Sequence, residues 1–184
     1  MFDINFRIVD DLEYLSNVTS KQFDADMAPI VGFFQLNFDG NTEGYYHNNK
    51  LHEDEVGLEL LNIWFSSLAE AIIILEKESK YVAFQEIDTY NSWLEFIREE
   101  NDILKVSRVR DLEEFKEGSH AYIVTVKKDS FTYPEWKNVK ISFNEFKNKV
   151  KTKGNEYLKE IEKINPDLLR TRDISMLAKE LDSI

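Results

Sequence analysis

The chain has 184 residues, of which 42% are hydrophobic and 13% aromatic, and it contains no cysteine. This length and composition indicate one folded domain and exclude a disordered chain, while the absence of thiols excludes disulfides, thiolate nucleophiles and cysteine-ligated metal centres. The net charge is −12: residues 1–120 contain 10 Lys and Arg against 25 Asp and Glu (net −15), and residues 121–184 contain 13 against 10 (net +3). This charge disfavours non-specific DNA binding by the first part and favours either a basic partner or simply a solvated acidic surface.

The N-terminal part of the chain contains two segments in which apolar and polar side chains alternate, the pattern of a strand with one buried face. These segments span residues 2–9 and 31–38, and no structure is assigned to residues 10–30 between them. Asp39-Gly40-Asn41 is a turn signal, so residues 44–47 are expected to form the return strand of a hairpin.

A long apolar helix is expected over about residues 56–78. Its apolar side chains recur at helical spacing over most of the circumference, so the helix must be covered on more than one side. The residues that set this pattern are Leu61, Trp64, Leu68, Ile72 and Leu75. Polar side chains interrupt the segment and exclude a membrane span. They are Glu59, Asn62, Ser66, Ser67 and Glu70.

Four strand-like segments follow the helix, and the connections between the first three are too short for parallel crossovers. Neighbouring strands are therefore expected to pair antiparallel, as a meander. The longer connection before the last segment is expected to hold a helical turn around Leu112 and Phe115. The segments span residues 81–87, 92–98, 103–109 and 121–127, and a short strand is expected at 139–141.

A capping-box pattern predicts the start of a C-terminal helix. In Ser142-Phe143-Asn144-Glu145, the Ser hydroxyl and the Glu carboxylate can satisfy backbone donors that have no partner in the first turn. Helical spacing then continues over about residues 143–164, until Asn165-Pro166 stops it. Gly154 lies on or beside the apolar stripe, which predicts either a close approach by another backbone or a break between two shorter helices.

These elements define an α+β fold, in which an antiparallel β-meander packs against the long apolar helix (about 56–78) and the C-terminal helix (about 143–164). A last short helix, with Asp173 as its N-cap, is expected to dock residues 173–184 on the rest of a single α+β domain of residues 1–184. The N-terminal residues lack the basic and apolar stretches of a signal peptide, so we expect a cytoplasmic protein.

Sequence motifs of the common enzyme classes are absent. The six glycines form neither a Walker A nor a GxGxxG pattern, and no GxSxG nucleophile elbow occurs. The only cluster of nitrogen and oxygen ligands matches no established metal motif, and we interpret it as a solvated acidic loop. It consists of His47, His52, Glu53, Asp54 and Glu55. We therefore predict no catalytic residues, no cofactor and no metal site, with metal binding by this cluster as the open alternative.

Glu86 and Glu95 are the pair of carboxylates that best fits an enzyme such as a glycosidase, because each interrupts an apolar strand of a predicted hairpin. Since acidic residues are abundant, we interpret both as lying on an outward strand face. Nucleic-acid binding is not expected, because the lysines of the C-terminal helix spread around it instead of forming one stripe. They are Lys147, Lys149, Lys151 and Lys153.

Aromatic side chains in two segments are candidates for a partner-binding surface, because Tyr and Trp provide large, rigid contact areas. One segment is the loop from Phe131 to Trp136, and the other is Tyr45-Tyr46. In the competing interpretation the rings fold back over the sheet. The candidate partner-binding residues are Tyr45, Tyr46, Phe131, Tyr133 and Trp136.

Two short motifs carry a resemblance to known proteins. Leu61-Asn62-Ile63-Trp64-Phe65 opens the apolar helix, and Asn91-Ser92-Trp93-Leu94-Glu95-Phe96 lies in the second strand after it. Over residues 60–109, about a quarter of the chain, the sequence resembles small uncharacterised bacterial proteins, some of which look like the immunity proteins encoded beside polymorphic toxins. The resemblance implies a cytosolic, non-enzymatic protein that neutralises a toxin by binding it, and it assigns no binding residues.

Three functional hypotheses follow. The first is a non-enzymatic, immunity-type module that binds a protein partner, such as a basic toxin domain, through an acidic and aromatic surface. The alternative is a small-ligand-binding or regulatory module with a pocket between the sheet and the long helix. The third is an enzyme that uses scattered carboxylates. They predict, respectively, an exposed aromatic patch rimmed by acids, an enclosed cavity with convergent polar groups, and carboxylates of perturbed pKa in a cleft.

Overall fold

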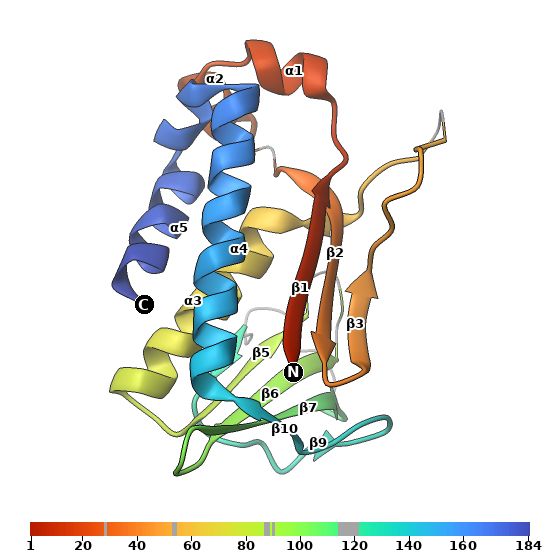
Figure 1. Ribbon diagram of the computed structural model, residues 1–184, viewed down its shortest axis with the longest axis vertical. Coiled ribbons are helices and arrows are strands. Elements are labelled where there is room, and N and C mark those ends of the chain that lie inside the picture. The colour runs from red at the N-terminus through yellow and green to blue at the C-terminus, as the bar shows by residue number, and fades with distance from the viewer. Residues whose placement is uncertain (28, 53–54, 87–88, 90, 114–121) are drawn as a thin grey trace.

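The computed structural model describes residues 1–27, 29–52, 55–86, 89, 91–113 and 122–184. It has the predicted α+β fold, with two antiparallel sheets and three longer helices that pack along one side of them (Figure 1). Within the described ranges, no helix has both the length and the apolar content that crossing a membrane requires.

The first sheet is formed by β1 (Phe2–Ile8), β2 (Val31–Phe38), β3 (Asn41–Tyr45) and the short β4 (Glu59–Leu60). Its strand order is β1-β2-β3, and β4 pairs with the start of β2. The return strand β3 begins earlier than predicted, because a tight turn lets Asn41 pair with Phe38 at once. Asp39 and Gly40 form this turn with φ angles of 51° and 91°, in the region that glycine adopts without strain.

Residues 10–30, to which the sequence assigned no structure, contain two short helices, α1 (Leu12–Asn17) and α2 (Ser20–Asp26). The side chains of Asp11 and Thr19 cap their first turns. Each helix buries a single side chain, so neither produces a periodic apolar pattern.

The second sheet contains the predicted meander. It is formed by β5 (Tyr81–Gln85), β6 (Ser92–Arg98), β7 (Ile103–Asp111), β8 (Ile123–Val124), β9 (Phe131–Thr132) and β10 (Val139–Ser142). β5, β6 and β7 pair antiparallel in sequence order, as predicted. The prediction for the fourth strand is wrong, because β8 is shorter and pairs with β5, while β9 and β10 occupy the edge of β7. The predicted turn around Leu112 and Phe115 falls mostly on residues that are not described.

Helix α3 (Leu61–Lys77) is the long apolar helix, and it contacts both sheets. It begins later than predicted because Glu59–Leu60 pair with β2 as a strand. The preceding turn is tightly packed, since a Cβ on Gly57 would lie 2.3 Å from Cα of Gly32. The main hydrophobic core forms around α3 from both sheets and the C-terminal helices.

Helix α4 (Phe143–Ile164) has the predicted bounds, and the 3-10 turn η1 (Pro166–Arg170) follows it. Ser142 Oγ accepts a hydrogen bond from the Glu145 N–H at 3.0 Å, as a capping box requires. The Glu145 carboxylate, however, accepts from the N–H of Phe2 at 3.1 Å. Only the Ser142 hydrogen bond of the expected capping box is formed, and the Glu145 carboxylate instead links the start of α4 to β1.

Helix α5 (Arg172–Ser183) packs against α3 and α4. Its N-cap is Thr171 and not Asp173, because the extended backbone ends at Thr171 and Asp173 already lies in the first turn. α4 continues unbroken through Gly154, where a Cβ would lie 2.7 Å from both δ-methyl carbons of Leu181. Gly154 is therefore packed against the side chain of Leu181 in α5. The predicted close approach of another backbone and the predicted break in the helix are both wrong.

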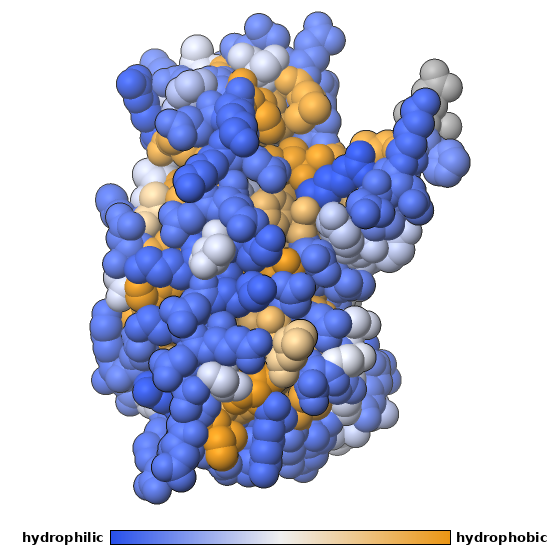
Figure 2. Space-filling model, viewed as in Figure 1, coloured by the Kyte–Doolittle hydropathy of each residue, from blue (hydrophilic) through white to orange (hydrophobic). Residues whose placement is uncertain are grey.

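The connection between β3 and β4 projects from the body of the molecule as an arm (Figure 1). Its described part comprises residues 46–52 and 55–58, and the projecting surface is mainly hydrophilic (Figure 2). Arg7 of β1 holds the base of the arm, since its Nη1 donates to the Asn49 carbonyl at 2.8 Å.

Candidate functional site

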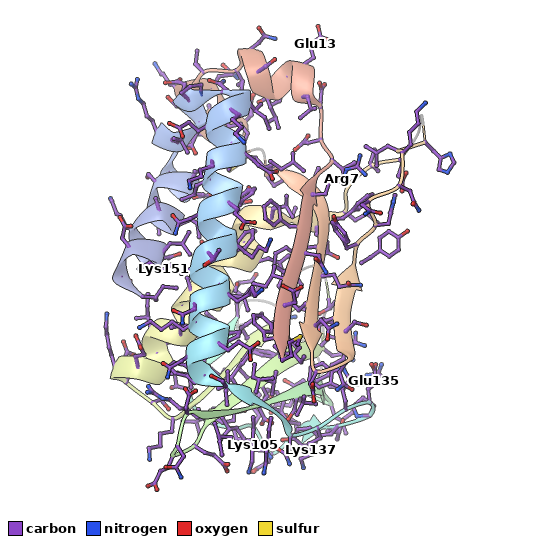
Figure 3. All side chains as sticks on the ribbon, viewed as in Figure 1. Arg7, Glu13, Lys105, Glu135, Lys137 and Lys151 are labelled. Atoms are coloured by element: carbon purple, nitrogen blue, oxygen red, sulfur yellow. The ribbon has the colours of Figure 1, made fainter. Side chains whose placement is uncertain are left out.

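Three carboxylates converge on one guanidinium where the first sheet meets the second. Arg108 on β7 places its Nε 2.8 Å from Glu43 Oε2 and 3.5 Å from Glu86 Oε1. Its Nη1 lies 2.7 and 2.6 Å from the two carboxylate oxygens of Glu135. Glu43 belongs to β3, Glu86 directly follows β5, and Glu135 lies beside the lower end of β3 (Figure 3). These four residues are called the acidic cluster below.

Burial governs the protonation of this cluster. The side chains of Glu86 and Glu43 are 5% and 11% exposed. Burial raises the pKa of Glu43, and Arg108 partly offsets the effect. Burial, followed by the charge of Glu43, raises the pKa of Glu86 to about 7 against the lowering effect of Arg108. Glu86 therefore changes its charge close to neutral pH.

A further carboxylate, Glu59 on β4, lies near the acidic cluster. It accepts a hydrogen bond from Trp64 Nε1–H at 2.6 Å, and its negative charge contributes to the raised pKa of Glu43. The Arg108 guanidinium thus contacts three carboxylates, and the negative charge of a fourth, Glu59, acts on Glu43. When these groups are ionised, the region carries an excess of negative charge that Arg108 cannot balance.

A cavity of about 470 Å³ adjoins the acidic cluster, between α3 and the ends of β5 and β8. Its helical wall is one face of α3, formed by Ile63, Ser66, Ser67 and Glu70 at helical spacing. The two short serine side chains leave space that larger residues would fill. Glu86 lines this cavity as well as belonging to the acidic cluster. The space is called the α3–β5 cavity below.

Two glutamates and a glutamine are among the described polar residues that line the cavity. Gln85 is 8% exposed, its Nε2 donates to the Thr89 carbonyl, and its Oε1 accepts no hydrogen bond from the part of the chain that the structure describes. Burial, and then the charge of Glu78, raises the pKa of Glu70 at the same cavity. No Lys, Arg or His is among the described residues that line it.

The prediction that Glu86 and Glu95 lie on an outward strand face is wrong, because both are buried. They do not face one another either. Glu86 contacts Arg108, whereas Glu95 lies on the other face of the second sheet, on the side of the small cluster around Trp93. There the hydroxyls of Tyr81 and Tyr133 donate to Glu95 Oε1 at 3.2 and 3.0 Å. Each buried carboxylate thus has polar partners at one of its oxygens or a nearby guanidinium.

The aromatic loop predicted to bind a partner folds back over the second sheet. Phe131 is 6% exposed and its ring centroid lies 5.5 Å from that of Trp93. Tyr133 is half-buried through its bond to Glu95, and Trp136 is half-buried with its ring 5.6 Å from Phe38.

The two tyrosines of the first sheet are placed differently. Tyr45, at the end of β3, is 60% exposed, and its ring lies 5.6 Å from that of Phe33. Tyr46, where the arm begins, is half-buried. Of the five predicted partner-binding residues, Tyr45 therefore presents the most exposed ring, and it lies on the same strand as Glu43 of the acidic cluster.

The histidine-containing loop is held together by Glu55. Its Oε1 lies 2.5 Å from His47 Nε2, and its Oε2 accepts from the N–H of His52 at 3.0 Å. His47 Nδ1 accepts from the Asn49 N–H, so both ring nitrogens have partners. The hydrogen bond from the His52 backbone, followed by the one with His47, lowers the pKa of Glu55. Glu53 and Asp54 lie outside the described residues, and among those described no group of three or more His, Asp or Glu could hold a metal ion.

Arg108, Glu43 and Glu135 are not predictable as a site from the sequence, because they come from three separate parts of the chain and no sequence pattern links them. Two local signals did point to the site. The apolar helix contains an adjacent pair of serines, and Glu86 interrupts an apolar strand.

Comparison of the chain with models of known protein families, with curated proteins and with solved structures finds no match. The function must therefore be argued from the residues and their geometry.

Proposed function

We propose that this chain is a cytoplasmic, non-enzymatic protein-binding module of the immunity type, which neutralises a basic toxin domain by binding it at the acidic cluster. The observation that carries the proposal is the convergence of Glu43, Glu86 and Glu135 on the single guanidinium of Arg108. A basic partner adds positive charge where, among the described residues, three carboxylates share one guanidinium.

The location of the charge favours binding over a purely structural role. Glu135 is the most exposed carboxylate of the acidic cluster, with 47% of its side chain accessible, so an incoming cation can reach it. Glu43 and Glu86 lie deeper, where the lower effective dielectric strengthens their attraction for a cation. Charge of one sign also speeds association with a partner of the other sign.

An exposed aromatic side chain belongs to the same strand as Glu43, with its ring packed on Phe33. Tyr45 is exposed two positions after Glu43 on β3, which is an edge strand of the first sheet. Exposed tyrosines next to a charged rim are typical of the residues that dominate interface energies. The proposed surface therefore consists of Tyr45 and the acidic cluster, while Phe131 and Trp136 support the sheet beneath it.

The proposal predicts a toxin-like reading frame beside the gene for this chain, and its test is binding to that toxin domain by isothermal titration calorimetry. Tyr45→Ala and Glu135→Gln are each expected to weaken binding about tenfold, which is roughly 1.4 kcal/mol. Glu100→Gln, the same charge change in an exposed turn, is the control and should have no effect.

Salt gives an independent readout of the same surface. Raising the ionic strength from roughly 50 to 300 mM should slow association by about tenfold, because the steering field is screened within a few ångströms. Binding that ignores salt and both substitutions would contradict the acidic surface as the site of contact.

A second candidate function, a small-ligand module, is favoured by one specific observation. The α3–β5 cavity lies between the long helix and the sheet, where that hypothesis places its pocket, and its volume of about 470 Å³ falls in the range of ligand sites.

A further inference from the structure

We propose that the α3–β5 cavity is a binding pocket for one cationic group, a guanidinium or ammonium on an apolar stem, with Glu86 taking the positive charge. The inference rests on the proposed function and deepens it, because a side chain of the basic partner can deliver this group. A free small amine or guanidine has the same chemistry. The cavity and the acidic cluster share Glu86, so one cation can be held by both.

Glu86 lies farther from the guanidinium than the other two carboxylates of the acidic cluster. The Nε of Arg108 lies 2.8 Å from Glu43 but 3.5 Å from Glu86. The Nη1 of the same guanidinium is taken by Glu135. Glu86 Oε1 accepts no hydrogen bond from any described residue, although it is buried. A buried carboxylate with too few cationic partners is costly, so a second cation gains more here than at an exposed acid.

Gln85 is a second buried polar residue at the end of β5. It lines the same cavity and is more than nine-tenths buried. Its Nε2 is engaged by the Thr89 carbonyl, which leaves Oε1 as an acceptor that no described residue satisfies. Gln85 pairs with Trp93, so its side chain points to the Trp93 face of the sheet, while Glu86 follows it on the α3 side. Guanidinium and ammonium groups have donors and no acceptor, so they match a cavity lined by the Glu86 carboxylate.

The described lining favours a cation over an anion. An anion would meet Glu70 and Glu86 with no Lys, Arg or His among the described lining residues to balance them. Glu70 is exposed on α3, where its charge attracts a cation towards the cavity.

The remaining walls fit an alkyl stem. Leu60, Ile63 and Ile123 provide apolar surface around the polar end of the cavity. Long basic side chains lay their methylene groups along such surface while the charged head reaches a polar partner. Ser66 and Ser67 leave the room for the stem and offer hydroxyl acceptors.

The test is titration of the full-length, ¹⁵N-labelled chain at pH 8 with three probes, followed by NMR. The probes are n-butylguanidinium, the capped peptide acetyl-Gly-Arg-Gly-amide, and its citrulline counterpart, which has the same shape without the charge. Saturable shifts are expected at the amides of Ser67, Gln85 and Ile123 with both guanidinium probes. The citrulline peptide should bind at least about tenfold more weakly.

Two variants and one control locate the pocket. Glu86→Gln keeps the shape and removes the charge, so affinity for both guanidinium probes should fall about tenfold or more. Ser67→Leu fills the cavity and should abolish the shifts. Glu100→Gln removes one charge from an exposed turn and should leave the affinities unchanged. If Ser67→Leu fails to fold, the affinity of Glu86→Gln for the probes decides the test. This variant is expected to fold, because a neutral side chain of equal shape is easier to bury than a carboxylate.

The two sources of the cation are distinguished by the probes. If the arginine peptide binds as tightly as n-butylguanidinium or more tightly, the pocket is assigned to a side chain of a protein partner. In that case the main chain of the peptide remains outside the cavity and does not hinder binding. Binding of butylguanidinium that is about tenfold tighter than that of the peptide assigns it to a free small ligand. Equal binding of the citrulline peptide, undiminished affinity in Glu86→Gln, or the absence of saturable shifts would overturn the inference.

Failure of this inference differs from failure of the proposed function. If toxin binding depends on Tyr45 and Glu135 while no probe enters the cavity, the inference alone is wrong. If the probes bind but the toxin domain does not, the proposed function is wrong and the cavity is a site for a free ligand.

Discussion

Glu86 and Glu95 are buried at similar depth on neighbouring strands of one sheet, yet their surroundings differ. Glu95 receives hydrogen bonds from Tyr81 and Tyr133, and the ammonium groups of Lys127 and Lys137 lie 4.9 and 3.8 Å from the Tyr133 ring centroid. Both hydroxyls donate to Oε1 of Glu95, while its Oε2, like Oε1 of Glu86, accepts no hydrogen bond from the described residues. Figure 3 labels Lys137 at the foot of the molecule.

The surroundings of Glu86 are different. One guanidinium is shared with Glu43 and Glu135, and the carboxylate borders a cavity instead of a packed wall. The comparison teaches that burial of a carboxylate does not by itself mark a functional site. A buried carboxylate that has few hydrogen-bond donors and borders a cavity does mark a candidate site. Such a carboxylate is stabilised by a ligand that brings donors and positive charge.

The largest expected effect is the loss of the shared guanidinium. Arg108→Met leaves the carboxylates of the acidic cluster facing one another, so the free energy of unfolding should fall by about 4 kcal/mol at pH 8. Urea denaturation measures it. Arg110→Met, an exposed arginine on the same strand, is the matched control and should change stability by less than about 0.5 kcal/mol. If Arg108→Met lowers the free energy of unfolding only slightly, the three carboxylates do not repel one another strongly in the folded chain.

Glu95→Leu tests whether Glu95 is held by its hydrogen bonds to the two tyrosines. The substitution leaves the hydroxyls of Tyr81 and Tyr133 without their acceptor, so stability should fall by about 3 kcal/mol. Tyr133→Phe removes one of the two donors and should cost about 1 kcal/mol. If Glu95→Leu is as stable as the wild type, Glu95 is not held by these bonds, and the contrast with Glu86 disappears.

Glu86→Gln should act in the opposite direction, with an effect that grows as the pH rises from about 5 to about 7. The pKa of Glu86 is raised to about 7, so the folded chain binds its proton more tightly than the unfolded chain and loses stability as the pH rises from 5 to 8. The groups that face Glu86 are Glu43, Arg108 and Glu135, with Glu70 across the cavity.

Relative to the wild type, Glu86→Gln should therefore gain about 2 kcal/mol between pH 5 and pH 8, because the variant carries no charge to bury. Thermal unfolding at the two pH values measures the difference. An equal shift at both would show that Glu86 does not change its charge in this window.

Several elements were predictable because their signals are local. α4 was predicted with its correct bounds, since the cap at Ser142 and the stop at Asn165-Pro166 both lie in its own sequence. The meander of β5, β6 and β7 followed from short connections that allow only antiparallel neighbours. α1 and α2 were not predicted, because each buries only one side chain.

The acidic cluster was not predictable in the same way. Glu43 and Arg108 are 65 positions apart and meet only because β3 of one sheet lies against β7 of the other. The edge that β8 joins, and the folding of the Phe131 to Trp136 loop over the sheet, are likewise decided by contacts between distant segments.

The sequence by itself determined the α+β class, the long apolar helix, the C-terminal helix and the acidic first two-thirds of the chain. Periodicity, caps and charge are properties of neighbouring residues, and they survive without knowledge of the fold. Only the tertiary structure decided which carboxylates are buried, which one borders a cavity, and which tyrosine remains exposed. Burial and the sharing of one guanidinium depend on what lies across the interface, so the pKa of Glu86 is a property of the assembled fold.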